Sequence, residues 1–302
     1  MAGSQKVVGS SPIGSTTKKK IDLPISIIIP TYNEADYIGY LLFSLSRQTY
    51  RRFEVIVSDG DSKDETLRLA SNFSHLLPLV LTAVSKKRSP AAQRNEGVKK
   101  ASYEQLLFLD ADTIISPDFI EKSLIEIRER KLDLAHPITY PLTQKMIDQY
   151  LQLIINWSLN LTQQVYPLAG GWAIFSTRTL HQQLNGFDER LKKVAEDTDY
   201  VARAAKLGAK FGILRNSPLY ISVRRRDYEG RGGNIKNTLL QGVYFALFGK
   251  YKAQKFIKRR YGDYKQLKRL VEKEKRRIEF LRPLTKEQLE KALRYLKDLV
   301  RE

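Results

Sequence analysis

Residues 106–113 read Leu-Leu-Phe-Leu-Asp-Ala-Asp-Thr, four apolar residues followed by two aspartates separated by one residue. A short apolar run of this kind is typical of a strand buried on both faces of a parallel sheet. Because side chains alternate along a strand, we expect Asp110 and Asp112 to point the same way at its carboxyl end, where open α/β sheets bind ligands. Two such carboxylates favour Mg²⁺ or Mn²⁺ shared with phosphate oxygens of a substrate. The stretch predicts a metal-assisted enzyme acting on a phosphorylated donor.

The composition is that of a globular protein without thiol chemistry. The chain has 302 residues, enough for one large domain or two small ones, and 42% of them are hydrophobic. It contains no cysteine, which excludes disulfides, zinc–thiolate sites and thiol nucleophiles. We find neither a signal-peptide core at the amino terminus nor an apolar run of about 18 residues. We therefore expect a cytoplasmic protein, either soluble or peripheral on the inner face of the membrane.

The net charge of +19 is concentrated near the carboxyl terminus. Residues 250–302 contain 19 Lys and Arg against 8 Asp and Glu, a net charge of +11, and the other 249 residues carry +8. Such a segment is suited to anionic lipid headgroups, nucleic acid or an anionic acceptor. The alternative is a solvated helical face that has no partner.

Strand-like and helix-like segments alternate up to residue 112. Residues 1–20, rich in Gly, Ser and Thr, are predicted to be a disordered leader. The predicted strands are 25–29, 53–57, 79–84 and 106–109, and the predicted helices between them are 34–48, 64–73 and 91–101. This alternation predicts βαβ units and a parallel sheet, and hence an α/β fold.

The second half of the chain is less regular. A strongly apolar helix is predicted at 146–161, a tight turn into a strand at 170–175, and a helix with acidic residues in its first turn at 195–207. Residues 222–233 are rich in Arg and Gly and are interpreted as a loop. We divide the chain into a catalytic domain at 21–235 and a basic amphipathic helical extension at 236–302.

Five short stretches occur in the order and spacing found in glycosyltransferase family 2, which the chain resembles. They are Pro30-Thr31-Tyr32-Asn33-Glu34, Asp59-Gly60-Asp61-Ser62-Lys63-Asp64, residues 88–97, Leu109-Asp110-Ala111-Asp112, and Glu196-Asp197-Thr198-Asp199. Each is weak alone, but together they extend from residue 25 to about residue 205. The resemblance implies a GT-A fold, which is Rossmann-like with a mostly parallel sheet. It also implies an inverting transferase, such as a hexosyltransferase, that takes a sugar from a nucleoside-diphosphate sugar.

The resemblance implies that the donor lies along the first strands. Pro30, Thr31, Tyr32 and Glu34 would clasp the nucleobase, although a capping role for Glu34 at the next helix is an alternative. Asp59 would accept a hydrogen bond from the base, and its alternative is a simple turn aspartate.

Two arginines of the third matching stretch are assigned to the donor diphosphate. Arg88 and Arg94 would bring guanidinium groups to the sheet edge, where they neutralise phosphate charge. The alternative is that both are ordinary surface charges of a helix.

The carboxylates carry the proposed chemistry. The resemblance implies that Asp112 is the direct metal ligand and that Asp110 contacts ribose or metal, so that charge on the leaving diphosphate is stabilised. A turn or cap role is the alternative for this pair. An inverting transferase needs one base, which the family places at Asp197, with Glu196 orienting or tuning it. The alternative is that both acids complement the helix dipole.

A basic loop and an aromatic residue complete the expected site. The loop holds Arg224, Arg225, Arg226 and Arg231. It would form a cationic lid over the diphosphate through Arg225 and Arg226, or contact an acceptor phosphate, or simply be solvated. Gly171 and Trp172 would form the acceptor-side wall, although a tryptophan buried in the core is equally compatible with the sequence.

The acceptor is the least constrained part of the prediction. The family often continues into transmembrane helices, whereas here the apolar segment 239–248 is about half a span and is followed by the basic tail. Together they resemble an interfacial element, which suits a lipid-linked or glycan acceptor at an anionic membrane surface. Alternatively, residues 236–302 pack on the catalytic domain or on a second protomer. The donor would be UDP-, GDP- or dTDP-linked.

Two other functions, a non-catalytic binding protein and a nucleotidyltransferase, fit the sequence less well. A non-catalytic protein that binds a membrane surface or nucleic acid through the basic tail would gain nothing from the acidic constellation, so a nucleic-acid partner is disfavoured. A nucleotidyltransferase would normally carry a glycine-rich phosphate loop after its first strand, and residues 30–34 contain no glycine.

Overall fold

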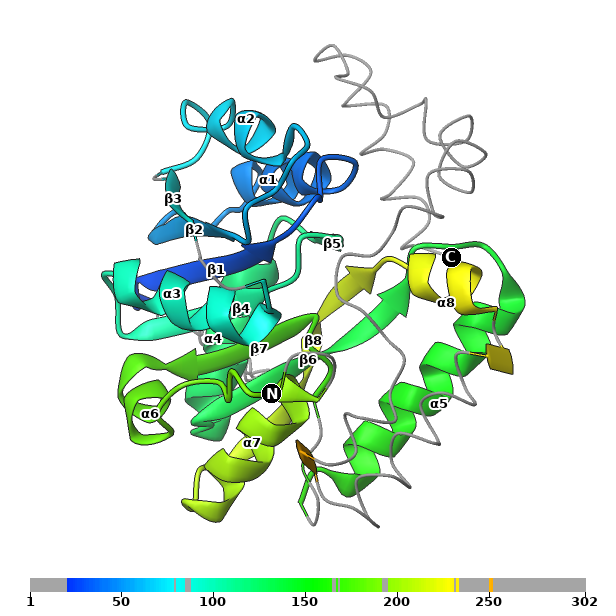
Figure 1. The fold of residues 1–302 in the computed structure, drawn as a ribbon. Coiled ribbons are helices and arrows are strands. Elements are labelled where there is room, and N and C mark those ends of the chain that lie inside the picture. The colour runs from blue at the N-terminus through cyan, green and yellow to red at the C-terminus, as the bar shows by residue number, and fades with distance from the viewer. Residues whose placement is uncertain are drawn as a thin grey trace, which may run out of the picture.

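The computed structural model describes residues 21–78, 80–84, 88–164, 167, 169–191, 195–230, 232–233 and 250–251. The predicted leader, Arg231 and nearly all of the predicted extension therefore lie outside the described residues. Within these ranges eight strands form one sheet in the order β3-β2-β1-β4-β7-β6-β8-β5 (Figure 1). The strands are β1 (Ile25–Thr31), β2 (Phe53–Asp59), β3 (Val80–Val84), β4 (Gln105–Leu109), β5 (Thr113–Ile115), β6 (Leu134–Pro141), β7 (Ala173–Thr177) and β8 (Phe211–Ile221).

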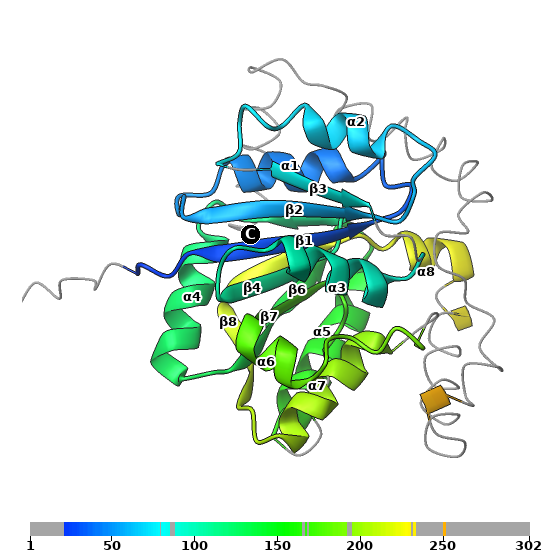
Figure 2. The ribbon, with the colours of Figure 1, turned by 60° about the vertical axis from the view of Figure 1, so that its left-hand side comes forward.

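Helices cover both faces of the sheet and give a three-layered α/β/α arrangement (Figure 2). The described helices are α1 (Ile38–Ser46), α2 (Thr66–Ser71), α3 (Pro90–Lys100), α4 (Phe119–Arg130), α5 (Met146–Thr162), α6 (Arg178–Gln183), α7 (Glu196–Lys206) and α8 (Arg224–Glu229). Side chains of α1, α2 and α4 join one hydrophobic cluster, and side chains of α3, α5, α6 and α7 join the other.

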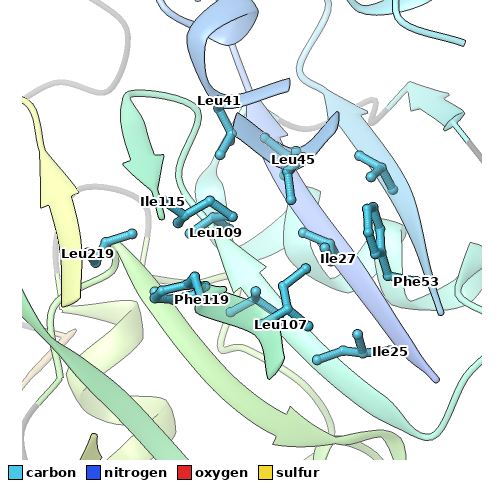
Figure 3. Packing of buried hydrophobic residues seen from close by; sticks show 14 of the residues in the cluster. Ile25, Ile27, Leu41, Leu45, Phe53, Leu107, Leu109, Ile115, Phe119 and Leu219 are labelled. Carbon is cyan, nitrogen blue, oxygen red and sulfur yellow. The ribbon is translucent and has the colours of Figure 1, made fainter. Parts of the chain in front are cut away.

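The apolar runs of the central strands are buried on both faces, as predicted. In β1, Ile27 belongs to the first cluster and Ile28 to the second. In β4, Leu107 and Phe108 divide in the same way, because consecutive side chains of a strand point to opposite faces. Figure 3 shows Ile27 and Leu107 packed with residues of α1 and α4 in the first cluster.

The sheet is mostly parallel, which confirms the predicted α/β fold class. β1 pairs in parallel with β2 and β4, and β6 with β8, whereas β7 lies antiparallel beside β4. Ala173 at the start of β7 is paired with Leu109 at the end of β4. The turn that precedes β7 is therefore at the same edge as the carboxyl ends of β1, β2 and β4.

Two predicted elements need correction. Helix α1 begins at Ile38 and not at Glu34, because Asn33 has a positive φ of 56° and a turn precedes the helix, in which the backbone N–H of Tyr37 donates to the carbonyl of Glu34. The predicted loop at 222–233 contains a helix, α8, because Arg224, Arg225 and Arg226 all precede the first glycine; Gly230, with a φ of 71°, ends the helix.

The sequence reading did not assign β5, α4, β6, α6 or β8, all of which belong to the second half of the sheet or cover it. None of the helices in the described ranges combines the length and the apolar character that crossing a lipid bilayer requires.

Candidate active site

The buried guanidinium of Arg94 connects three groups at this edge of the sheet, which are Asp110, Glu196 and the carbonyl oxygen of Gly171. It projects from α3 and is 1% exposed. One Nη atom lies 2.9 Å from Oδ1 of Asp110 and 3.1 Å from the carbonyl oxygen of Gly171, and the other lies 3.0 Å from Oε1 of Glu196. Although burial alone would lower its pKa, the pKa of Arg94 is raised by the surrounding carboxylates. Arg94 is therefore a charged bridge inside the protein.

This placement bears on the predicted role of Arg94. The guanidinium contacts protein carboxylates on the buried side of α3, while the exposed side of the helix carries Lys99. Burial on the sheet side reflects the close packing of α3, where a Cβ added to Gly97 would approach Ile28 to 2.4 Å. Contact of Arg94 with a diphosphate stays a prediction, and it would require rearrangement of these ion pairs.

Glu196 and Asp197 form the start of α7 and face the Arg94 bridge. Glu196 is 8% exposed, and Oδ1 of Asp197 accepts a hydrogen bond of 2.7 Å from the backbone N–H of Thr198. Removal from solvent, reinforced by the adjacent Glu196 carboxylate, raises the pKa of Asp197 to about 7. A carboxyl group with such a pKa is well matched to proton transfer near neutral pH.

Gly171 is the backbone position at which the carboxylates of Asp110 and Asp197 come close together. A Cβ at this position would lie 3.1 Å from an Nη atom of Arg94, 3.2 Å from Oδ2 of Asp197 and 3.7 Å from Oδ2 of Asp110. The structure thus brings together residues separated by up to 103 positions in the chain, from Arg94 to Asp197. The absence of a side chain at Gly171 allows this close approach.

Asp110 and Asp112 follow β4 in a turn. β4 ends at Leu109, so strand alternation does not determine the directions of the two side chains, which corrects that part of the prediction. Burial raises the pKa of Asp110 to about 6, although Arg94 acts in the opposite direction. Asp112 instead forms an ion pair with Arg224, whose Nε lies 3.0 Å from its Oδ2.

Arg224, the first residue of α8, forms a second ionic bridge at this edge. Its two Nη atoms donate to the two carboxylate oxygens of Glu34 at 2.7 and 2.8 Å, and its guanidinium lies 4.4 Å from the ring centre of Tyr37. Burial raises the pKa of Glu34 to about 7, although Arg224 opposes this. Glu34 is 4% exposed and contacts α8, so a direct contact with a nucleobase stays a prediction.

Asp59 holds the loop after β2 against the end of β1. It is fully buried and accepts hydrogen bonds from Oγ1 of Thr31 at 2.9 Å, from Oγ of Ser62 at 2.6 Å and from the backbone N–H of Ser62 at 2.7 Å. Pro30 and Thr31 are buried as the last residues of β1. Contact of Asp59 with a base stays a prediction that requires one of these hydrogen bonds to be exchanged.

Tyr32 and Arg88 provide the accessible side of this region. The guanidinium of Arg88 lies 5.3 Å from the ring centre of Tyr32, and its Nη2 lies 3.0 Å from Oδ2 of Asp61. The Arg88 side chain is 52% exposed. A half-buried aromatic ring beside an exposed guanidinium offers stacking and charge to an incoming nucleotide.

Trp172 is half-buried beside the carboxylates. Its ring lies 6.2 Å from that of His136, whose Nδ1 donates to the carbonyl of Ala173 at 2.6 Å. Burial lowers the pKa of His136 to about 4, so the ring is neutral near pH 7. A Cβ at Gly170 would approach the Trp172 ring to 2.3 Å, so this glycine leaves space for the ring. Trp172 combines packing on the core with partial exposure at the edge.

The three consecutive arginines of α8 have different surroundings. Arg224 contacts the carboxylates, Arg225 is exposed, and Arg226 is 8% exposed against α5. Arg226 lies 3.2 Å from the carbonyl oxygen of Asp148 and also donates to the side chain of Gln152. The structure places Arg226 against α5 and away from Glu34 and Asp112. The arginine that reaches these two carboxylates is Arg224. The sequence alone could not distinguish it from its neighbours.

Like the contacts of Arg224, the contact of Asn95 with Phe187, in the segment before α7, was not indicated by the sequence. Asn95 donates from Nδ2 to the carbonyl of Phe187 at 2.9 Å and accepts from the Phe187 N–H at 2.8 Å. The Phe187 ring in turn lies 5.3 Å from the Arg94 guanidinium. Asn95 thus helps to fix the surroundings of Arg94.

The donor atoms at the edge fit a divalent cation that is shared with a substrate. Within the described residues, no group of three or more His, Cys, Asp and Glu could hold a metal ion. Mg²⁺ and Mn²⁺ sites in nucleotide enzymes, however, commonly use one or two carboxylates together with phosphate oxygens and water. The ion pairs with Arg94 and Arg224 engage Oδ1 of Asp110 and Oδ2 of Asp112, one oxygen of each carboxylate.

Solved structures share this fold. A fragment of Staphylococcus aureus TarS, residues 1–349 in complex with UDP, aligns with a TM-score of 0.55 and 23% identity over 74% of this chain and 64% of the fragment. The mannosyltransferase PcManGT from Pyrobaculum calidifontis, in complex with GDP-Man and Mn²⁺, aligns with a TM-score of 0.61 and 20% identity over 78% of this chain and 65% of its own. The protein therefore has the GT-A fold of nucleotide-sugar glycosyltransferases.

Sequence comparisons point to the same family. Residues 26–169 match the model of Glycosyl transferase family 2, and residues 106–254 match that of Glycosyl transferase family group 2. Each match covers just under half of the chain, and over residues 26–254 the chain is similar to the glycosyltransferases that these models describe. The comparisons thereby favour an enzyme over the non-catalytic and nucleotidyltransferase alternatives.

Curated relatives agree with this assignment. The poly(ribitol-phosphate) beta-N-acetylglucosaminyltransferase TarS of Staphylococcus aureus is 27% identical over 67% of this chain and 36% of its own length. The amylovoran biosynthesis glycosyltransferase AmsB of Erwinia amylovora is 29% identical over 72% of this chain and 76% of its own length. The alignment with GlyA of Streptococcus pneumoniae, 25% identical over 75% of this chain, spans only 33% of that relative, so the matches to TarS and GlyA each cover about a third of the relative.

Proposed function

We propose that this protein is a metal-dependent, inverting glycosyltransferase that moves a sugar from a nucleoside-diphosphate sugar to an acceptor hydroxyl or phosphate. The observation that carries the proposal is the junction at Gly171, where a Cβ would lie 3.2 Å from Oδ2 of Asp197 and 3.7 Å from Oδ2 of Asp110. Inversion requires a base on the face of the anomeric carbon opposite the leaving group, and in the proposal Asp197 acts on the acceptor while Asp110 belongs to the leaving-group side. The solved relatives in complex with UDP and with GDP-Man support a nucleotide-sugar donor.

In the proposed reaction, Asp197 takes the proton of the acceptor hydroxyl while the acceptor oxygen bonds to the anomeric carbon. The bond between that carbon and the diphosphate oxygen breaks, and its electron pair leaves with the nucleoside diphosphate. The pKa of Asp197, about 7, allows the carboxylate to accept a proton near neutral pH. Glu196 and Arg94 would fix the position of Asp197, since Arg94 binds Glu196 and lies against the same glycine.

Asp110 and Asp112 would hold Mn²⁺ or Mg²⁺, and the bound ion would stabilise negative charge on the departing diphosphate. Tyr32 and Arg88 offer a half-buried ring and an exposed cation for the nucleotide. Trp172, half-buried beside Gly171, offers an aromatic face to the acceptor sugar. The acceptor would be a glycan or a lipid-linked molecule at an anionic membrane surface, in keeping with the basic tail.

The test measures sugar transfer and donor hydrolysis with UDP-, GDP- and dTDP-linked sugars and Mn²⁺. Asp197→Asn is expected to lower turnover by about 100-fold to 10,000-fold while donor binding persists, because only the base is removed. Asp112→Asn is expected to abolish the dependence of the rate on Mn²⁺ concentration. Asp133→Asn, in an exposed turn away from the site, is the matched control. Near-normal turnover by both site variants would disprove the proposal.

A further inference from the structure

Helix α5 differs from an ordinary surface helix, because it buries polar side chains together with Leu159 and exposes large apolar side chains on its outer side. Asp148 and Gln152 are 0% and 1% exposed. Large apolar residues on the opposite side are 51–66% exposed, and we call this set the α5 face: Met146, Ile147, Tyr150, Leu153, Ile154, Trp157 and Leu161. A helix that packs on a soluble core normally shows the reverse pattern.

The spacing of these residues places them on one continuous stripe. They recur at intervals of three and four positions over a helix of 17 residues, which is about 25 Å long. Asp148 is the only charged residue in the helix sequence, and it is buried. The α5 face is therefore a long apolar surface without charge, and exposed apolar surfaces of this extent mark interaction sites.

Hydrogen bonds on the inner side keep this face turned outward. Gln152 donates to Oγ1 of Thr139 at 2.6 Å, and Asn156 donates to the carbonyl of Thr139 at 2.7 Å. Arg226 of α8 contacts both Asp148 and Gln152. Rotation of α5 to hide its apolar residues would break all of these contacts and leave buried polar groups without partners, which is costly.

We propose that the α5 face docks on the surface of an anionic phospholipid bilayer. Trp157 and Tyr150 are the side chains that favour the boundary between headgroups and acyl chains. A face without charge can enter this boundary to a depth of about 5–10 Å without desolvating an ion. The net charge of +19, of which +11 belongs to residues 250–302, supplies attraction to anionic lipids.

The position of Lys250 connects the basic segment with the α5 face. Lys250 forms ion pairs with Asp188 and with Asp199 of α7. Helix α7 contributes Val201 to the same hydrophobic cluster as Leu159 of α5, so both helices cover the same face of the sheet. The described start of the basic segment, Lys250, is therefore attached to the side of the sheet that carries α5.

Helix α8 connects the α5 face with the candidate active site. Arg226 contacts α5, and Arg224, two residues earlier, forms ion pairs with Glu34 and Asp112. In this respect the inference rests on the proposed function, because docking would hold the sugar-transfer site close to the bilayer. This arrangement suits an acceptor that is anchored in lipid.

The test uses the full chain and vesicles of phosphatidylcholine with and without phosphatidylglycerol. Ile154→Glu and Trp157→Glu are each expected to weaken binding to the anionic vesicles by at least about tenfold, since each replaces inserted apolar area with a charge. Leu207→Glu is the matched control, because Leu207 at the end of α7 is 60% exposed and lies outside the α5 face. Its binding is expected to change less than about twofold, as for an isolated surface position.

Further measurements separate this inference from its alternatives. Unchanged binding of Ile154→Glu and Trp157→Glu, with loss of all binding at high salt, would show that the basic tail alone binds lipid and would overturn the proposal. A wild-type dimer in sedimentation velocity that dissociates on Ile154→Glu would assign the face to a second copy. A wild-type monomer without vesicle binding would also overturn it.

Donor hydrolysis distinguishes failure of this inference from failure of the proposed function. Both α5 variants are expected to hydrolyse the nucleotide sugar at the wild-type rate in solution, because neither residue contacts the candidate site. Vesicle binding without donor hydrolysis in the wild type would retain the docking surface and refute the proposed function. Donor hydrolysis by a wild type that does not bind vesicles would retain the proposed function and refute the docking surface.

Discussion

Two arginines bridge carboxylates at the same sheet edge, but they belong to different kinds of structure. Arg94 is 1% exposed on α3, a helix of 11 residues that packs on the central strands, and it binds Asp110 and Glu196. Arg224 has a side chain that is 10% exposed, opens the six-residue helix α8, and binds Glu34 and Asp112. The candidate metal pair is thus divided between the two bridges.

The difference indicates which half of the site is fixed. Arg94 is part of the core, and its loss would leave the buried Glu196 and the partly exposed Asp110 without their counter-charge. A helix as short as α8 has little stability of its own, so Arg224 can move at lower cost. We therefore expect Asp110 to keep its place throughout the reaction, and Asp112 to exchange Arg224 for metal and phosphate.

The largest expected effect is that of Arg94→Met. Removal of the buried cation leaves the buried Glu196 carboxylate without its partner, and it is expected to lower the free energy of unfolding by about 3–5 kcal/mol and to abolish sugar transfer. Lys99→Met is the matched control, because the Lys99 side chain is 70% exposed on the same helix, and its effect is expected to stay within about 0.5 kcal/mol. Urea unfolding measures both variants. Equal urea midpoints for Arg94→Met and Lys99→Met would show that Arg94 does not hold its half of the site in place.

The second prediction concerns pH, because each bridge has a carboxyl group with a pKa of about 7, Asp197 near Arg94 and Glu34 beside Arg224. A raised pKa means that the group is protonated below this pH, and a protonated Asp197 cannot act as a base. We expect kcat/KM to fall about tenfold per pH unit below pH 7, and the slope to disappear in Asp197→Asn.

Glu34→Gln tests whether this pH dependence belongs to the other bridge. It should retain the acidic slope of kcat/KM, because Glu34 does not take the acceptor proton in the proposed reaction. Loss of the slope in Glu34→Gln but not in Asp197→Asn would move the catalytic titration from the Arg94 bridge to the Arg224 bridge.

The smallest expected effect is that of Arg224→Met on metal binding. Removing a cation next to Asp112 is expected to tighten Mn²⁺ binding by about tenfold in the absence of donor, because Arg224 and the metal compete for the same carboxylate. Arg225→Met, an exposed neighbour on the same helix, is the control. Calorimetric titration measures both. An unchanged affinity in Arg224→Met would contradict the idea that Asp112 is the exchangeable half.

Local patterns were sufficient to predict the first half of the fold. Apolar runs such as 25–29 and 106–109 are short and flanked by turn residues, and they form strands buried on both faces. Asp110 and Asp197 could be proposed as site residues for the same reason, since they stand just after β4 and at the start of α7. The second half mixes parallel and antiparallel pairs, as β7 beside β4 illustrates, and pairing between distant segments leaves little local signal.

The arginines show why the rest could not be predicted. In a helix, successive side chains point about 100° apart, so Arg224, Arg225 and Arg226 point in three directions. The sequence favoured a loop and could not tell which arginine reaches the carboxylates. Arg94 presents the same difficulty, because only the packing of α3 on the sheet decides that its guanidinium is buried and not open to a diphosphate.

The sequence by itself predicted the fold class, the resemblance to glycosyltransferase family 2 and the acidic candidate residues, because periodicity and motif spacing are properties of neighbouring residues. Only the tertiary structure decided which cation meets which carboxylate, and that the apolar side of α5 faces outward. Both depend on contacts between residues far apart in the chain, such as Glu34 with Arg224 and Gln152 with Arg226. Those contacts exist only once the sheet has brought its edges together and the helices have packed on it.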